Sequence, residues 1–137
     1  MNRLLALLPV IFLAFGPAVF ASGTDAAPEL YFISPTDGET LKSPVQVRFG
    51  LKNMGVAPAG VDKANTGHHH LIIDSELPEM DRPIPNDANH RHFGGGQTEA
   101  SIELAPGKHT LQLLLGDFSH IPHKPPVVSQ KISITVE

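Results

Sequence analysis

Histidine is the residue type with the most chemical potential in this chain. The 137 residues include eight histidines and no cysteine, and the formal charge at pH 7 is -4 with histidine neutral. A neutral imidazole, with an ordinary pKa near 6.5, offers a lone pair that suits zinc or copper. The lack of cysteine excludes four-cysteine zinc sites, blue-copper centres and thiol nucleophiles. Metal binding by imidazole is therefore the chemistry to test.

The stretch TGHHHLIID, residues 66–74, carries three consecutive histidines. Side chains alternate along a strand, so His68 and His70 share one face and His69 points to the other. We expect His69 to be a buried, hydrogen-bonded core residue. Two further pairs have chelating spacing, one in the extended HRH stretch and one in the proline-rich HIPH loop: His90 with His92, and His120 with His123.

These histidines must be positioned by strands, because nearly every apolar run in the chain repeats with a period of two. No run sustains the 3.6-residue period of a helix. Strands are predicted at residues 30–34, 45–51, 69–74, 90–93, 98–104, 109–115 and 128–136. The pattern predicts an all-β fold, an antiparallel two-sheet immunoglobulin-like sandwich of about seven strands.

In that topology, three connections emerge at one end of the sandwich and bring seven histidines to one rim. The predicted metal ligands are His68, His70, His90, His92, His120 and His123. Possible additional ligands or supporting groups are His69, Met54 and Glu99, and a methionine thioether would favour copper. His109 is predicted at the opposite end, about 20 Å away, with its ring hydrogen-bonded to the backbone.

The amino terminus reads as a secretory signal peptide. Arg3 precedes the apolar run from Leu4 to Phe15, and Val19-Phe20-Ala21 fits a cleavage site. The run is shorter than the roughly 20 residues that span a membrane. We therefore expect a signal peptide at 1–21, a flexible leader at 22–29, one domain at 30–137, and a periplasmic or secreted protein without a membrane span after cleavage. The mild acidity argues against nucleic acid as a partner.

Four motifs in order, GHHHLIID, HFGGGQTEA, PGKHTLQLLLGD and HIPHKPPVVS, resemble a bacterial family of exported single-domain proteins classed as a domain of unknown function. The resemblance runs from about Tyr31 to Val136, which is nearly all of the chain beyond the signal peptide. It implies an exported all-β domain marked by histidines, and it implies no established reaction.

Three functions fit these observations. The favoured one is a periplasmic carrier or buffer of copper or zinc, with an envelope metal-handling protein as a possible partner. The second is a non-catalytic immunoglobulin-like interaction module that uses its histidines as contacts or as a pH sensor. The third is a cupin-like metalloenzyme built from His90, His92, Glu99 and His109. In a cupin His109 is a ligand and His120 is not, whereas the sandwich predicts the reverse. No catalytic residue is assigned, and a non-enzyme is expected.

Overall fold

The computed structural model describes residues 26–137, so the predicted signal peptide lies outside the described residues. The described chain contains nine strands and no helix. The strands are β1 (Glu29–Ser34), β2 (Thr40–Leu41), β3 (Val45–Lys52), β4 (Gly55–Val56), β5 (Thr66–Ile73), β6 (His90–His92), β7 (Glu99–Ile102), β8 (Gly107–Gly116) and β9 (Ile132–Val136). Since no helix occurs there, none of the described residues forms a long apolar helix that could cross a membrane.

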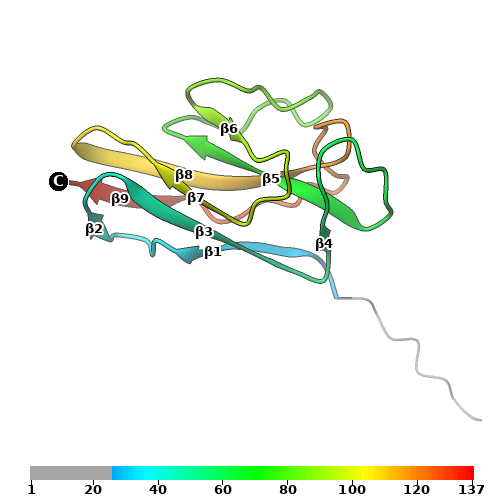
Figure 1. The fold of residues 1–137 in the computed structure, drawn as a ribbon, viewed down its shortest axis with the longest axis horizontal. Coiled ribbons are helices and arrows are strands. Elements are labelled where there is room, and N and C mark those ends of the chain that lie inside the picture. Colours follow the sequence, from blue (N-terminus) through cyan, green and yellow to red (C-terminus); the bar gives the residue numbers. More distant parts are fainter. Residues whose placement is uncertain (1–25) are drawn as a thin grey trace, which may run out of the picture.

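The strands form two sheets, as predicted. One sheet has the order β1-β3-β7, and the other has the order β2-β9-β8-β5-β4 with β6 added to β5 (Figure 1). Most neighbours are antiparallel, while the two short strands β2 and β4 pair in parallel with β9 and β5. Each of the seven remaining strands overlaps one of the seven predicted runs, although the bounds differ; β5 begins three residues before the predicted run 69–74, and β9 begins four residues after the start of 128–136. The all-β, two-sheet architecture is therefore confirmed.

The position of β6 differs from the immunoglobulin pattern used for the prediction. In the constant-type sandwich the fourth long strand pairs with the fifth. Here β6 instead pairs with β5, and His92 lies opposite His70 while His90 lies opposite Ile72. This register matters for function, because it places an imidazole of β6 directly beside an imidazole of β5.

The main core lies between the two sheets. Alternate residues of β3 (Val45, Val47 and Phe49) face inward and meet Leu71 and Ile73 of β5. The inward side chains are almost fully buried, and burying each aliphatic or aromatic group contributes about 1.5–3 kcal/mol. This packing fixes which face of β5 looks into the core and which looks away from it.

A second, smaller hydrophobic cluster covers the outer face of the six-stranded sheet. It consists of Ile72 from β5, Leu114 from β8 and Ile84 from the segment between β5 and β6. That segment, residues 75–88 and here called the strap, lies over this face, and its Ile84 is buried against the sheet. The Ile84 amide donates to the His120 carbonyl at 2.8 Å, which ties the strap to the loop that follows β8.

Candidate metal centre

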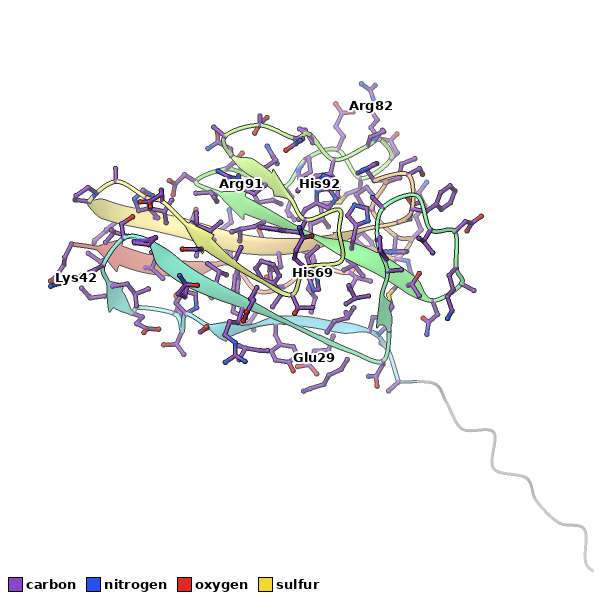
Figure 2. The ribbon with its side chains drawn as sticks, viewed as in Figure 1. Glu29, Lys42, His69, Arg82, Arg91 and His92 are labelled. Carbon is purple, nitrogen blue, oxygen red and sulfur yellow. The ribbon has the colours of Figure 1, made fainter. Side chains whose placement is uncertain are left out.

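Strand β5 is the element that positions the histidines. It lies between β8 and β6 in the larger sheet, and every residue from Gly67 to Ile73 is buried. Because side chains alternate, His69 points into the core with Leu71, while His68 and His70 point to the outer face with Ile72. Figure 2 shows His69 and His92 on opposite sides of β5. The predicted separation of the triplet is therefore present in the structure.

Three imidazoles converge on the outer face: His68, His70 and His92, here called the three-histidine cluster. The ligand nitrogens of the cluster all lie within 4.8 Å of one another. The two Nε2 atoms of His68 and His70 are 3.0 Å apart. Two nitrogens that bind one ion at 2.0–2.1 Å with a tetrahedral angle would be about 3.3 Å apart. The nitrogens of His68 and His70 are therefore nearly at coordination spacing, whereas the ligand atoms of the cluster that are up to 4.8 Å apart must move closer by up to about 1.5 Å.

A fourth ring, that of His120, packs against this cluster. Its centroid lies 4.7 Å from that of His92 and 5.0 Å from that of His68. His120 comes from the loop after β8 and has a left-handed backbone with φ of 69°. This conformation is unusual for a residue with a side chain, and the surrounding loop must hold it.

Asp117 holds the loop that carries His120. Its Oδ1 accepts hydrogen bonds from the amide of Ser119 at 2.8 Å and from the amide of Ile121 at 2.9 Å. The His120 amide in turn donates to the Asp117 carbonyl at 3.0 Å. These bonds lower the pKa of the Asp117 carboxyl although its partial burial opposes them, so the group is an anion at neutral pH. Its negative charge opposes, but does not reverse, the lowering of the His68 pKa that burial causes.

Two glycines leave space for the imidazoles. Gly116 of β8 lies opposite His68, and a Cβ at this position would stand 2.9 Å from His70 Nε2. A Cβ at Gly94 would collide with the His92 ring. Neither position needs a positive φ, so the constraint is the close approach of the ring to the backbone.

The cluster is held in the neutral, metal-binding form. Burial lowers the pKa of His68 to about 4, with the neighbouring His92 and His120 adding to the effect. Burial and the adjacent His68 lower the pKa of His70 to about 3. The pKa of His92 is also lowered, chiefly by burial. At pH 7 all three rings are therefore neutral, so no net release of protons is needed, but the proton shared between Nε2 of His68 and Nε2 of His70 must move to Nδ1 before both Nε2 atoms can bind an ion.

Each ring of the cluster also has a buried nitrogen without a hydrogen-bond partner among the described residues: His68 Nδ1, His70 Nδ1 and His92 Nε2. A buried polar atom left without a partner costs about 1–3 kcal/mol. Three such atoms are expensive for a purely structural core. A bound ion would take a lone pair from each ring, and the ring nitrogen that does not bind the ion would still need water or another polar partner.

The structure does not bring every predicted ligand into the cluster. His90 shares a face with His92, but its Nδ1 lies 2.8 Å from Asp87 Oδ1 and its ring lines a separate pocket beneath the strap. His123 lies over Gly67, where its Nε2 would be 2.7 Å from an added Cβ. Gly67 faces the same way as His69, so His123 lies on the opposite side of β5 from His68. The six predicted ligands therefore occupy three different places.

The possible supporting residues are also elsewhere. His69 packs against Phe49 with 5.0 Å between ring centroids, and Met54 packs against the main core. His69 is buried in the core, as predicted, but neither of its nitrogens makes a well-formed hydrogen bond; the backbone of Gln97 lies near enough to oppose in part the lowering of the His69 pKa by burial. Glu99 is an exposed residue of β7, on the other sheet, and pairs with Arg48 at 3.6 Å.

His109 lies at the beginning of β8, away from the cluster. Its Nδ1 is 2.6 Å from Asp74 Oδ2, and its Nε2 donates a hydrogen bond to the Ala105 carbonyl at 2.7 Å. The predicted backbone hydrogen bond is therefore present. With both nitrogens occupied, His109 has no lone pair for a metal, and the four residues of the cupin-like arrangement are not gathered in one place.

The sequence pattern predicted a site at the rim formed by the loops at one end of the sandwich, and the structure does not place the cluster there. It lies on the outer face of the larger sheet, under the strap and the loop after β8. The sequence patterns identified the histidines, but the space made by Gly116 and the cover supplied by Ile84 depend on the pairing of β5 with β8 and on the path of the strap. No local sequence pattern indicates the pairing of β5 with β8 or the path of the strap.

Comparison with known proteins adds a family and no function. A family described as "Domain of unknown function (DUF4399)" matches residues 47–137, which is most of the described fold from β3 to the last residue. No curated protein and no solved structure matches the chain.

Proposed function

The chain belongs to the DUF4399 family, whose description records no activity, and from the site geometry we propose that it is an exported metal-binding protein that carries or buffers zinc or copper. The observation that supports this most is the three-histidine cluster, whose rings are neutral, with His68 and His70 buried and their Nε2 atoms close to coordination spacing. His120 supplies a fourth imidazole when its ring turns toward the ion. Periplasmic or secreted location follows from the predicted signal peptide.

The ligand chemistry favours zinc and copper over calcium or magnesium. All three donors of the cluster are imidazole nitrogens, whereas calcium and magnesium require oxygen ligands. No thioether joins the cluster, since Met54 lies against the main core, so the expected preference is for the divalent ions. Geometry and availability, not ligand type, would decide between Zn(II) and Cu(II).

A carrier or buffer fits the site better than an enzyme. An ion that activates water needs an open position and a nearby general base. The strap and the His120 loop cover the cluster, and Glu99, the carboxylate that the sequence offered as a base, belongs to the other sheet. Asp117, the nearest anion, is already engaged in three hydrogen bonds that build its loop.

Calorimetric titration with Zn(II) and Cu(II) tests the proposal. Every strand among the described residues lies within residues 29–136, so the chain from residue 22 onward, without an affinity tag, is the appropriate sample. We expect about one equivalent bound with a Kd below about 1 μM, which corresponds to about 8 kcal/mol.

The decisive variant is His70→Leu, which keeps the volume of a buried side chain and removes a central ligand. It should weaken binding at least 100-fold while the urea-unfolding midpoint of the metal-free protein is retained or raised. His109→Gln is the matched control and should bind as the unchanged protein does. No binding tighter than about 1 mM for either ion would refute the proposal and favour the interaction module.

A further inference from the structure

We propose that the pocket beneath the strap, with His90 at its base, is a second and weaker site for a divalent metal ion, from which the ion passes to the three-histidine cluster. The proposal rests on the proposed function of that cluster for its role, but the site itself can be tested separately. It concerns a pocket of about 400 Å³ between the strap and strand β6.

His90 is the residue that points to a ligand here. It is only 8% exposed, and Asp87 Oδ1 contacts its Nδ1 at 2.8 Å. The described residues give Nε2 no hydrogen-bond partner, and the ring lines the pocket. A carboxylate on one ring nitrogen fixes the tautomer and leaves the lone pair on the other, which is the arrangement that metal-binding histidines commonly show.

Asp87 is itself well held for this role. Its Oδ1 accepts hydrogen bonds from the amides of Asn89 and His90, both at 2.9 Å. These contacts, led by the bond to the His90 ring, lower the pKa of the Asp87 carboxyl. The carboxylate is therefore anionic at neutral pH and can keep the Nδ1 proton of His90 in place.

The same pocket offers oxygen ligands from the strap. Glu76 and Glu79 both line it. Each now pairs with a cation, Glu76 with Lys131 at 3.0 Å and Glu79 with Arg82 at 2.8 Å. Exposed ion pairs of this kind contribute about 0–1 kcal/mol, so either carboxylate can leave its partner for a metal ion at little cost. These donors are not gathered at coordination spacing in the structure, where His68, His70 and His92 are the group of three found among the described residues, so Glu76 or Glu79 must turn toward His90 to bind an ion there. Such a site is expected to be weak and exchangeable.

The location gives the site its role. His90 and His92 lie two residues apart on the same face of β6, a separation of about 7 Å at 3.3 Å per residue. His68 and His70 of the three-histidine cluster are fully inaccessible and His92 is partly buried, whereas the pocket at His90 opens to solvent. An ion captured at His90 would therefore have a short path to the cluster, along β6 and under the strap.

His109 provides an internal control for this reasoning. It also pairs with an aspartate, at 2.6 Å, but its second nitrogen is already bonded to the Ala105 carbonyl. The two histidines lie on different strands, but both pair with an aspartate through Nδ1, and they differ in the availability of Nε2 and in that only His90 lines this pocket. A metal effect that follows His90 and spares His109 would identify this nitrogen as the cause.

The test uses Zn(II) as the probe and His70→Leu as a background in which the cluster is disabled. In that background, imidazole ¹⁵N spectra should show a Zn(II)-dependent shift of His90 Nε2 with a Kd of about 10–1000 μM, and no shift of His109. In the otherwise unchanged protein, His90→Gln should slow zinc loading of the cluster about tenfold, measured by stopped flow, without changing the tight affinity. His109→Gln should alter neither quantity.

The two proposals fail in different ways. A silent His90 in the spectra, or an unchanged loading rate in His90→Gln, would overturn the capture site even if the tight site exists. A His90 shift without any tight binding in the unchanged protein would instead refute the role of the cluster and leave His90 as the metal site. Because the spectra are recorded with His90 present, the result does not depend on the folding of a His90 variant.

Discussion

Acid should destabilise the metal-free protein strongly, because three buried histidines are neutral in the fold. The pKa values of His68 and His69 are lowered to about 4 and that of His70 to about 3, with burial as the largest cause in each case. In the unfolded chain the same groups titrate near 6.5. Below pH 6.5 the unfolded state therefore binds more protons, and the free energy of unfolding falls as the pH falls.

The expected size of the effect follows from these values. Between pH 6.5 and pH 5 each such group changes the free energy of unfolding by about 1.36 kcal/mol per pH unit, or about 2 kcal/mol in total. The three groups together amount to about 6 kcal/mol at pH 5. Domains of this size have a total stability of about 5–15 kcal/mol. The loss at pH 5 is thus a large share of what holds the metal-free fold together.

Other titrating groups do not cancel this loss. The Asp74 carboxylate raises the pKa of His109, so this residue stabilises the fold below pH 6.5, but it is one group against three. The pKa values of Asp87 and Asp117 are lowered from 3.8, so their contributions are lost only below that pH. Between pH 6.5 and pH 4 the buried histidines therefore dominate the change in the free energy of unfolding.

Urea unfolding followed by far-UV circular dichroism, at pH 8 and pH 5 with a chelator present, measures the loss. His69→Leu is the informative variant, because His69 faces the core and is not part of the three-histidine cluster. It should reduce the difference between the two pH values from about 6 to about 4 kcal/mol. A difference below about 1 kcal/mol in the unchanged protein would refute the reasoning, since the histidines would then be hydrated or partnered in the fold.

Three further predictions concern the packing and the loop around the cluster. Gly116→Ala should weaken Zn(II) binding about tenfold or more in a chelator competition, because the new Cβ displaces an imidazole of the cluster. Gly95→Ala is the control and should bind Zn(II) normally, because its new Cβ contacts only the flexible side chain of Gln97. Asp117→Ala should release the His120 loop and lower the free energy of unfolding by about 2–3 kcal/mol; an unchanged urea midpoint would contradict the assigned hydrogen bonds. His109→Gln should lose more stability at pH 6 than at pH 9, because Asp74 raises the pKa of His109 in the fold. The protonated ring stabilises the fold below the ordinary histidine pKa, and this contribution disappears as the pH rises through the folded pKa. An equal loss at both pH values would contradict the ion pair.

Much of the fold was accessible from the sequence because strands leave a period-two pattern. Runs such as VQVRFGL, residues 45–51, alternate clearly, and the structure places a strand there. The two-residue strands β2 and β4 leave no such pattern, since two residues cannot show alternation. The partner of β6 was equally inaccessible, because pairing depends on contacts between segments that are distant in the sequence.

The site shows the same division. Alternation alone separated His69 from His68 and His70, since it depends only on the local backbone. Whether His90 and His123 lie beside His68 and His70 depends on the positions of the short strand β6 and the loop after β8. The prediction that all of these histidines gather at one end of the sandwich did not account for these positions. Asp87 explains the case of His90: three residues away in the sequence, it takes one ring nitrogen and turns the other toward a different pocket.

The cost of burying the cluster and its affinity for metal are two aspects of the same arrangement. Three imidazole nitrogens without partners, at about 1–3 kcal/mol each, take several kcal/mol from a fold whose total stability is about 5–15 kcal/mol. The main core between the sheets must supply that energy in the metal-free protein. An ion bound by the three rings would offset part of this cost, so binding and folding are linked, and a ligand at 100 times its Kd stabilises by about 2.7 kcal/mol. A chain that buries its histidines in this way is least stable, and most sensitive to acid, in the absence of metal.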